Sequence, residues 1–347
     1  MVRLSSPEPC SAPAERETSF ATPEIIPIAS SYLLQARGGE MTRYIVRRIL
    51  FFIPVLFVIT LITFITIRTI PGGPFDFIGD KSLPPTVVAN LEAKYHLDDP
   101  LWKQFVDYLW GVIRLDFGPS YRQRGRSVND IIGGALGTSA QLGAVALFIS
   151  ILVGLPTGIL AALKQNSIVD YMSTFIAVVG RSIPNIVLGP LLMWIFALQM
   201  GWFPTSGWGR PIQVVLPAVT LSTTFSAYIA RLTRASLLQV VGEDYIRTAR
   251  AKGLAERVVI VGHALKNSLI PVVTIMGPIF AAVLTGTFVV EQIFAIQGMG
   301  KHFVTSVGNR DYPVVMATTL VYAAAIAVAN LMVDVTYAFL DPRIRYE

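Results

Sequence analysis

The chain has 347 residues, of which 53% are apolar and only 14% are charged, and its mean hydropathy is +0.58. A soluble domain carries roughly 25% charged residues, so this chain lacks the polar side chains that a water-exposed surface needs. The net charge is +6, but the basic residues lie beside apolar runs, which indicates membrane topology instead of a nucleic-acid surface. We therefore expect an integral membrane protein whose partners include lipid but no nucleic acid.

Residues that commonly bind metals or form disulfides are scarce. Cys10 is the only cysteine, which excludes an intrachain disulfide and a thiolate metal site. The three histidines, His96, His263 and His302, are far apart in the sequence and lack metal-ligand spacing. We expect neither a metal nor a cofactor.

The N-terminal segment 1–40 is rich in Ser, Pro, Glu and Ala and shows no sustained periodicity. This composition predicts a disordered polar tail. Met41 opens the segment Met-Thr-Arg-Tyr-Ile-Val-Arg-Arg, which leads directly into the first apolar run. A further hypothesis is therefore that translation starts at Met41, which N-terminal sequencing of the native protein would test.

Six apolar runs follow, each close to the roughly 20 residues that a helix needs to cross the hydrocarbon core. Because lipid offers the backbone no hydrogen-bond partners, we expect each run to be a helix. The fourth run is the weakest, since it contains several Ser and Thr residues. The expected spans are 49–67, 136–163, one within 168–200, 213–229, 269–290 and 314–339.

Small and helix-breaking residues occur inside these runs. Gly154 and Gly158 have the spacing of close helix packing. Four prolines interrupt the runs. They could kink helices at a gate, but we favour the interpretation that they only accommodate helix packing. The prolines are Pro184, Pro190, Pro271 and Pro278.

The basic residues predict the orientation of the spans. With the N-terminus inside, the cytoplasmic segments carry 13 Lys and Arg, whereas the two short outer segments carry 3. This is the positive-inside bias, and an even number of spans places both termini in the cytoplasm. The cytoplasmic segments are 41–48, 164–170, 231–268 and 341–347, and the short outer segments are 201–213 and 291–313.

The stretch 68–135 between the first two spans is too long for a turn. It contains apolar residues at helical spacing, which predict short helices outside the membrane or at its outer interface. These residues are Val87, Val88, Leu91 and Tyr95, then Leu101, Phe105, Leu109 and Ile113. We accordingly divide the chain into 1–40, 41–134, a transmembrane domain at 135–341 and a tail at 342–347.

The longest cytoplasmic segment contains a predicted short helix. Glu243 and Asp244 precede it, where acidic groups stabilise a helix N-terminus. Ala249 and Ala251 add little bulk, and Gly253 fits the position just beyond a helix C-terminus. A short helix with small side chains can dock into a groove on a partner. Force on it would move the attached spans as rigid bodies.

An alternative interpretation is that this segment is an ordinary basic loop that contacts anionic lipid. Against it, residues 245–253 and 263–271 resemble the coupling loop of binding-protein-dependent ABC importers, and most closely that of the peptide-transport branch. The general family pattern is Glu-Ala-Ala, three residues, Gly, nine residues, then Ile-x-Leu-Pro. Gly253 matches it. Arg-Thr-Ala at 247–249 and His-Ala-Leu-Lys at 263–266 stand at the two flanking motifs and depart from the general pattern.

The resemblance extends from about Met41 to Glu347. It implies the first of two related permease subunits, with an all-α type-1 importer fold of five core spans and one leading span. Further matches are at 44–50, 70–74, 95–102, 291–300, 309–313 and 341–346.

The resemblance also implies partners and a cargo. A second permease would complete a heterodimeric pore, two cytoplasmic ATPase subunits would drive it, and an extracytoplasmic solute-binding protein would deliver the solute. Di- or oligopeptides are the implied cargo, while nickel complexes, glutathione and oligosaccharides stay open. The residues implied to contact an ATPase groove are Glu243, Asp244, Tyr245, Arg247, Ala249, Ala251 and Gly253.

The chain lacks the motif that would let it hydrolyse ATP itself. A P-loop needs Gly-x-x-x-x-Gly-Lys-Ser/Thr, and the nearest candidate, Gly300-Lys301, has Ala295 and His302 at two required positions. We find no coherent catalytic set, so a membrane-bound enzyme is not supported. The main alternative is a secondary transporter or channel that works without ATPases, which usually shows internal repeats that we do not find here.

Arg181 is an ionisable residue inside the third apolar run. Such a residue suggests function, and it could meet a substrate carboxylate in the pore. The interpretation that we favour is that Arg181 lies near the inner end of its span and snorkels, or pairs with Asp170 or Asp334.

Overall fold

The computed structural model describes residues 28–75, 77–78, 81–82, 84–123 and 125–340. The chain forms two compact units, Met1–Tyr44 and Ile45–Glu347. Helix α1 (Ile28–Thr69) begins in the first unit, so residues 28–40 are helical where a disordered tail was expected. Residues 1–27 lie outside the described part of the chain. The rest of the description concerns the second unit.

The second unit is almost entirely helical, with one small exception. Strands β1 (Phe77–Ile78) and β2 (Lys81–Ser82) pair antiparallel in the stretch 68–135. The helices after α1 are α2 (Pro85–Lys94), α3 (Leu101–Ile113), α4 (Val128–Leu163), α5 (Ile168–Ser182), α6 (Asn185–Leu192), α7 (Pro211–Val241), α8 (Asp244–Ala251), α9 (Glu256–Val258), α10 (Lys266–Ser268), α11 (Ile270–Ile293), α12 (Met299–Asn309) and α13 (Tyr312–Leu340), with π-helical stretches η1 (Met193–Gln199) and η2 (Val259–Leu265).

Each of the six expected spans contains helix, and among the described residues four single helices are long and apolar enough to cross a membrane. Two further spans are possible if each of two bent helix pairs is one span. The four are Arg43–Thr69, Val128–Leu163, Pro211–Val241 and Tyr312–Met332, and the pairs are Ile168–Ser182 with Asn185–Gln199 and Glu256–Ser268 with Ile270–Phe280.

Prolines stand at both bends. Helices α5 and α6 meet at 105°, and Pro184 stands just before α6. The residue before it, Ile183, is extended (φ −86°, ψ 115°), because a residue preceding proline disfavours the helical region. The third span is therefore not one straight helix. Pro271 lies in the first turn of α11, at the 45° bend, whereas Pro190 and Pro278 lie inside helices.

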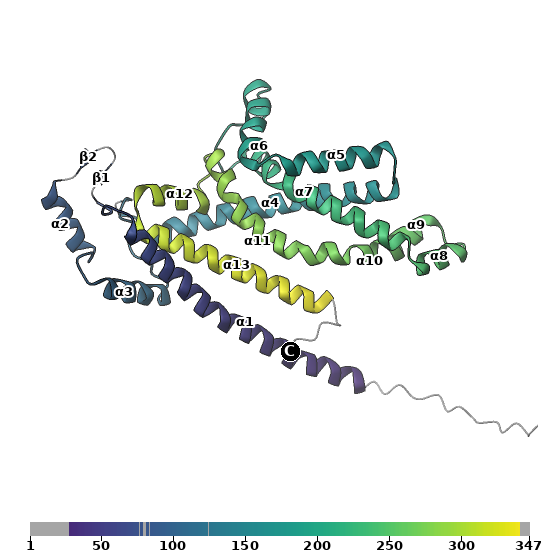
Figure 1. Ribbon diagram of the computed structural model, residues 1–347, viewed down its shortest axis with the longest axis horizontal. Helices are drawn as coiled ribbons and strands as arrows, with labels where there is room; N and C mark the ends of the chain where they lie inside the picture. The colour runs from purple at the N-terminus through teal and green to yellow at the C-terminus, as the bar shows by residue number, and fades with distance from the viewer. Residues whose placement is uncertain (1–27, 76, 79–80, 83, 124, 341–347) are drawn as a thin grey trace, which may run out of the picture. The chain divides into compact units, whose positions relative to one another are not determined.

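Helices α4 and α7 lie side by side (Figure 1) because glycines let them approach closely. A side chain at Gly154 would meet Ile229 Cβ at 2.8 Å, and one at Gly158 would collide with the carbonyl oxygen of Ala230. This contact confirms the helix-packing interpretation of the two glycines.

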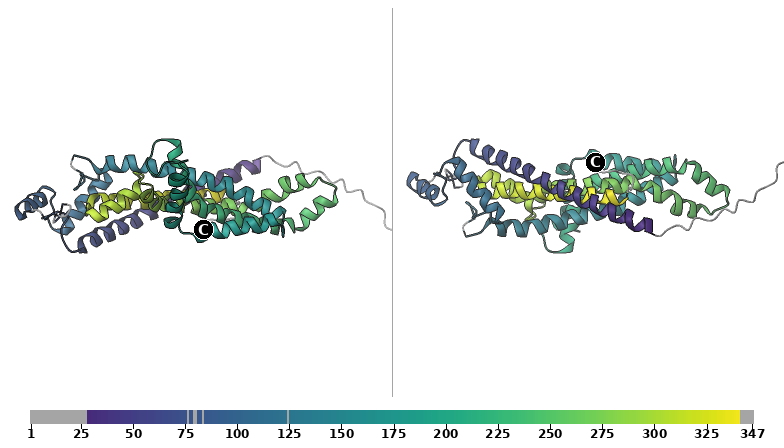
Figure 2. Two further views of the ribbon diagram at one scale, coloured as in Figure 1. Left: turned by 90° about the horizontal axis from the view of Figure 1, so that it is seen from above. Right: turned by 90° about the horizontal axis from the view of Figure 1, so that it is seen from below.

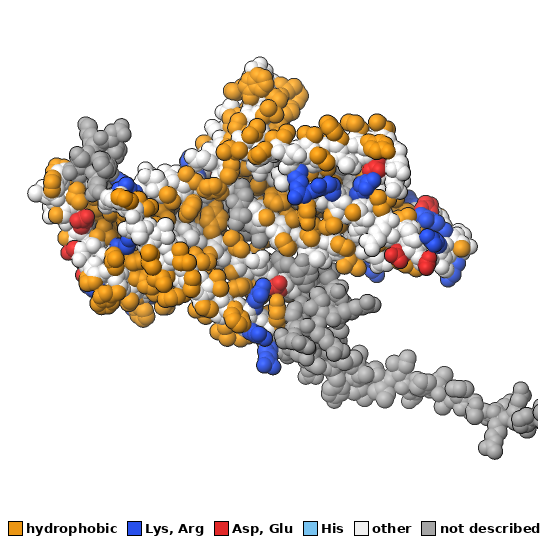
Figure 3. Space-filling model, viewed as in Figure 1, with side chains coloured by type: hydrophobic (Ala, Val, Ile, Leu, Met, Phe, Trp, Pro, Cys, Tyr) orange, Lys and Arg blue, Asp and Glu red, His pale blue; other side chains and the backbone are white. Residues whose placement is uncertain are grey.

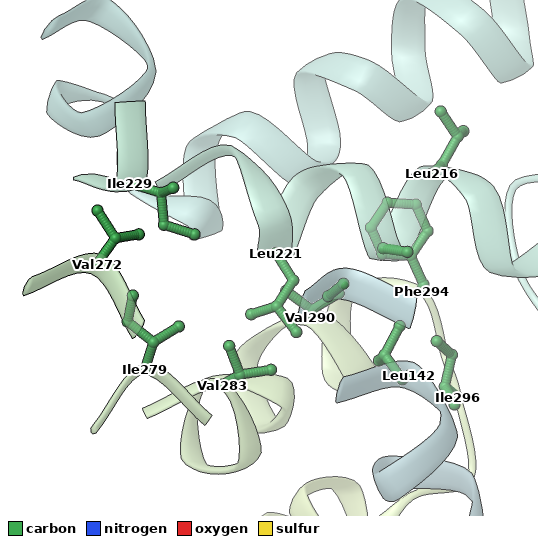
Figure 4. Close-up of a cluster of buried hydrophobic side chains, with 12 residues drawn as sticks. Leu142, Leu216, Leu221, Ile229, Val272, Ile279, Val283, Val290, Phe294 and Ile296 are labelled. Atoms are coloured by element: carbon green, nitrogen blue, oxygen red, sulfur yellow. The ribbon is translucent and has the colours of Figure 1, made fainter. Parts of the chain in front are cut away.

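The main apolar core lies between α4, α7 and α11 (Figure 4). Leu142, Leu221 and Val283 are fully buried there. By contrast, many large apolar side chains are exposed on the outside of the bundle, and hydrophobic side chains are spread over much of the face shown in Figure 3. Ile53 of α1, for example, is 60% exposed. An apolar exterior of this kind is what lipid requires.

The charged segment that contains α8 and α9 and the stretch 68–135 lie at opposite ends of the second unit. Helices α8 and α9 lie at one end, and α2 and α3 lie at the other (Figures 1 and 2). Basic and acidic side chains gather over α8 and α9 (Figure 3). The stretch 68–135 forms the short helices expected of it.

Candidate coupling and translocation site

Helix α7 leads directly into the predicted coupling segment. It continues to Val241, well beyond the end expected near residue 229. Residues 231–241, which were expected to belong to a cytoplasmic loop, are therefore part of the helix. Only Gly242 and Glu243 separate α7 from α8, so a displacement of α8 acts on α7 through a very short connection.

Both ends of α8 are built as the sequence predicts. Glu243 is extended (φ −69°, ψ 150°), and Asp244 occupies the first turn, where its charge suits the helix dipole. At the other end Gly253 adopts φ +78°. The N–H of Gly253 donates to the Arg250 carbonyl (2.9 Å) and that of Leu254 to the Ala249 carbonyl (3.4 Å). These two bonds form a Schellman motif, which ends the helix.

Helix α8 has one face inside the protein and one face outside. Ile246 is fully buried and Ala249 is 8% exposed. Ala249 was expected to present a small side chain to a partner, and in this structure its methyl group packs against this chain. The outward face consists of residues at helical spacing (i, i+3, i+4, i+7). They are Asp244, Arg247, Thr248 and Ala251, all exposed.

The buried face of α8 joins it to three membrane helices. Its apolar cluster combines Ile246 and Ala249 with Ala162 at the end of α4, Leu237 of α7 and Ala264 of η2, which leads into α11. Burial of this kind holds α8 as part of one body with these helices.

Polar contacts add to the attachment of α8 and the helices around it. Asn267 Nδ2 donates to the Tyr245 hydroxyl at 2.8 Å. The Ser236 hydroxyl of α7 donates to the carbonyl of Ser268 at 2.7 Å. Tyr245 is 42% exposed, so one side of its ring is open to a partner.

An ion pair braces the turn after α8. Arg250 Nε and Nη2 donate to the two carboxylate oxygens of Glu256, at 3.1 and 2.8 Å. On α8 itself, Arg247 pairs with Asp244 at 3.3 Å, and both are exposed. Exposed pairs add little stability, so the Asp244 and Arg247 charges are available to a partner.

An ion pair between a buried aspartate and a half-buried arginine links α5 to α7. Arg234 Nε and Nη2 donate to the two carboxylate oxygens of Asp170, at 2.6 and 2.8 Å. Asp170 is 2% exposed and also accepts from the Asn166 backbone N–H at 3.0 Å. Because a bidentate pair is rigid, α5 is connected through α7 to the coupling segment.

Arg181 does not form either of the ion pairs expected of it. Asp170 binds Arg234, and Asp334 binds Arg48 at 3.0 Å. Arg181 is exposed and lies over the ring of Tyr228, 5.7 Å from its centroid. It stands in the last turn of α5, about 20 Å along the axis from the α4–α5 turn. The expectation of a position near the inner end is therefore not supported.

A buried carboxylate organises the other end of the bundle. Glu291, at the end of α11, is fully buried and accepts from the Ser139 hydroxyl (2.5 Å) and from the N–H of Gly300 (2.8 Å) and of Lys301 (3.3 Å). These amides belong to the first turn of α12, where a negative charge is favoured. Glu291 thus joins α4, α11 and α12.

A second buried carboxylate connects the loop before α4 to the start of α13. Asp311, between α12 and α13, accepts from the Ser120 hydroxyl (2.5 Å) and the Tyr121 N–H (3.0 Å). Arg122 Nε donates to the Asn309 carbonyl at 2.6 Å. The loop that precedes α4 is therefore held against the start of α13.

The sequence alone assigned no role to Glu291 and Asp311, the two buried carboxylates that link these helices. Glu291 lies directly after the fifth apolar run and before a Gly-Met-Gly stretch, and Asp311 lies between two helices. An ionisable residue next to an apolar, membrane-spanning segment is by itself a reason to expect a specific role for that residue. Its partner, however, lies 152 residues away for Glu291 and 191 for Asp311.

A bundle of membrane-length helices with a short, firmly seated helix at one end has the architecture of a transport permease driven from outside its own chain. The profile described as "Binding-protein-dependent transport system inner membrane component" matches residues 154–346. The corresponding N-terminal profile, "Binding-prot-dependent transport system membrane comp, N-term", matches residues 41–142.

Two relatives are similar over most of the chain. The dipeptide transport system permease protein DppB of Bacillus subtilis is 46% identical over 305 residues, covering 88% of this chain and 98% of the relative. The oligopeptide transport system permease protein OppB of Escherichia coli is 45% identical over 308 residues, covering 88% of this chain and 100% of the relative. The inward-facing MetNI methionine ABC transporter has a similar fold, with a TM-score of 0.51, 20% identity and coverage of 61% of this chain and 96% of that chain.

The chain belongs to the family of binding-protein-dependent transport system inner membrane components. It is a multi-pass membrane permease with the type-1 ABC importer fold. As a permease it is non-catalytic, and ATP hydrolysis belongs to separate ATPase subunits. The alternative of a secondary transporter or channel finds no support in this assignment.

Proposed function

We propose that this chain forms half of the pore of an importer for di- or oligopeptides. The relatives DppB and OppB support this cargo, since their names specify dipeptide and oligopeptide transport. In this proposal a second, related permease completes the pore, two ATP-binding subunits bind from the cytoplasm, and a solute-binding protein docks outside. Both chain ends are cytoplasmic, a topology supported by the excess of basic residues in the inner segments.

The observation that carries the mechanism is the two-faced helix α8. Its buried face is continuous with α4, α7 and the start of α11 through Ile246 and Ala249. Its exposed face offers Asp244, Arg247 and Ala251, which would lie in a groove of an ATPase subunit. Closure of the ATPase pair would then displace α8 and the attached spans as rigid bodies and open the pore outward.

Other site residues have supporting roles in this proposal. Glu243 and Gly253 define the two ends of α8, and Tyr245 links it to Asn267. The Asp170–Arg234 pair passes the displacement on to α5. Arg181, at the far end of α5, would meet the carboxylate of a passing peptide. Its exposure and its distance from the α4–α5 turn support this assignment.

Reconstitution tests the proposal. The chain is placed in proteoliposomes with the second permease, the ATPase subunits and the binding protein, and uptake of a labelled tripeptide is measured with and without ATP. We expect uptake only with ATP and only with the ATPase subunits present. Uptake by liposomes that lack the ATPases would overturn the coupling mechanism, and ATP-driven uptake of a different solute but no peptide would overturn the cargo.

A further inference from the structure

A cavity at the end of the bundle opposite α8 is not used by the coupling mechanism. Its volume is about 370 Å³, and it lies between α1, α3, the start of α13 and the loops at 94–97 and 116–121. Binding cavities for small molecules measure roughly 300–1,000 Å³, so this one suits a small ligand. Its walls include the aromatic side chains of Phe64, Tyr95, Tyr121 and Tyr312.

Three residues that line this cavity each have a buried polar atom without a hydrogen-bond partner among the described residues. The atoms are Arg68 Nε, Gln104 Oε1 and the Tyr108 hydroxyl oxygen. Buried polar atoms in native proteins are nearly always hydrogen-bonded. Three such atoms around a single cavity therefore point to a polar occupant.

Arg68 supplies a cation, and among the described residues no group accepts a hydrogen bond from its Nε. Its Cζ lies 4.2 Å from the ring centroid of Phe64 and 5.8 Å from that of Tyr312. Stacking of this kind uses the flat faces of the guanidinium and leaves the in-plane N–H groups available. In the part of the chain that the structure describes, Arg68 forms no ion pair with a carboxylate. A guanidinium with free in-plane donors suits a carboxylate.

Gln104 supplies an acceptor whose orientation is determined by its neighbours. Its Nε2 donates to the carbonyl oxygens of Leu97 (3.0 Å) and Asp99 (2.6 Å). Because both partners are acceptors, the nitrogen must face them, which leaves Oε1 to accept from another group.

Tyr108 supplies a second donor. Burial raises the pKa of its phenol, so the hydroxyl keeps its proton at neutral pH. The side chain belongs to α3 and also packs against the cluster that contains Phe64, which holds the ring in place.

We infer that this cavity binds a small molecule through a carboxylate, to which Arg68 and Tyr108 donate, while Gln104 Oε1 accepts from an N–H of the same molecule. Free amino acids and dipeptides carry both groups. The inference does not depend on the proposed function, because binding here requires neither ATP nor transport.

Calorimetry on the assembled importer in lipid nanodiscs, without nucleotide or binding protein, tests the inference. The probes are the dipeptide Ala-Ala and its C-terminal amide. We expect Ala-Ala to bind, and the amide to bind about tenfold more weakly, because it lacks the charged acceptor. Arg68→Gln and Tyr108→Phe should each raise the Kd for Ala-Ala by about tenfold. The matched control is Arg114→Gln, which removes a nearby guanidinium that stacks on Trp110 at 4.6 Å outside the cavity lining and should leave the Kd unchanged.

Tyr108→Phe keeps the ring, so it stays informative if Arg68→Gln fails to fold. The inference is overturned if the wild type binds no Ala-Ala, if the amide binds equally well, or if Tyr108→Phe binds like the wild type. ATP-driven uptake, measured on the same preparation, tests the proposed function separately.

Discussion

Replacing Ile246 by Ala should loosen α8 from the membrane helices without disturbing the rest of the fold. Ile246 is fully buried in a cluster with Leu237, Val259 and Ala264. The substitution removes about three carbon atoms at roughly 0.8 kcal/mol each, and the cavity left behind brings the loss to about 2–4 kcal/mol. Since about 1.4 kcal/mol is a tenfold change, the seated state of α8 should be disfavoured by about two orders of magnitude.

Hydrogen–deuterium exchange with mass spectrometry on peptides covering residues 243–253 measures this change. The matched control is Val258→Ala, because Val258 lies on the neighbouring α9 and is 51% exposed. We expect Ile246→Ala to speed exchange in α8 by about a hundredfold through local opening and to leave exchange in α4 unchanged. ATP-driven uptake should fall in parallel. Exchange rates that differ by less than about threefold between the two variants would refute the reasoning that the buried face seats α8.

Substitutions at three further positions test the end of α8, the contact between α11 and α12, and the substrate path. Gly253→Ala forces an alanine into φ +78°, at a cost of about 1–2 kcal/mol, and should increase exchange at the C-terminal end of α8 in the same assay. Gly253→Asn should increase exchange less. Equal protection of α8 in the two variants would contradict this prediction. Gly298→Ala places a methyl group against the Glu291 carboxylate and should destabilise the protein by about 1–3 kcal/mol. A lower midpoint of thermal unfolding would report this loss. An unchanged midpoint would show that α11 and α12 are not closely packed at this position. Arg181→Gln should reduce peptide uptake at normal expression, and wild-type uptake would remove Arg181 from the substrate path.

The short helix α8 could be predicted because its signals are local. Glu243 and Asp244 at its start and Gly253 at its end act within a few residues, and the structure confirms both ends. Its inner and outer faces could not be assigned in the same way. Whether Ala249 points toward this chain or toward a partner depends on α4 and η2, which pack against it from elsewhere in the sequence.

Charges that pair over long distances misled the prediction of helix ends. Arg231 and Arg234 read as the start of a cytoplasmic loop, so the fourth span was ended near residue 229. The helix continues instead to Val241, and Arg234 within it pairs with Asp170, which lies 64 residues earlier in the sequence. The same pairing removes Asp170 as a partner for Arg181, and the Arg48–Asp334 pair removes the other candidate.

The sharp bend in the third span could not be predicted from its apolar composition. Pro184 was noted as an interruption, yet composition alone does not distinguish a mild kink from the 105° turn between α5 and α6. The angle depends on how α6 packs against α7 and α11, a tertiary effect. Composition therefore sufficed for the class of protein and its membrane runs, but not for the shape of this span.

Site-specific photo-crosslinking from the exposed face of α8 tests the central claim most directly. A photoreactive amino acid replaces Arg247 in the assembled, transport-competent importer, and the control position is Val307 of α12, which is 46% exposed at the opposite end of the bundle. We predict a crosslink from position 247 to an ATPase subunit, with a yield that changes when ATP is added, and none from position 307. Absence of an ATPase adduct at position 247 while uptake continues would contradict the account.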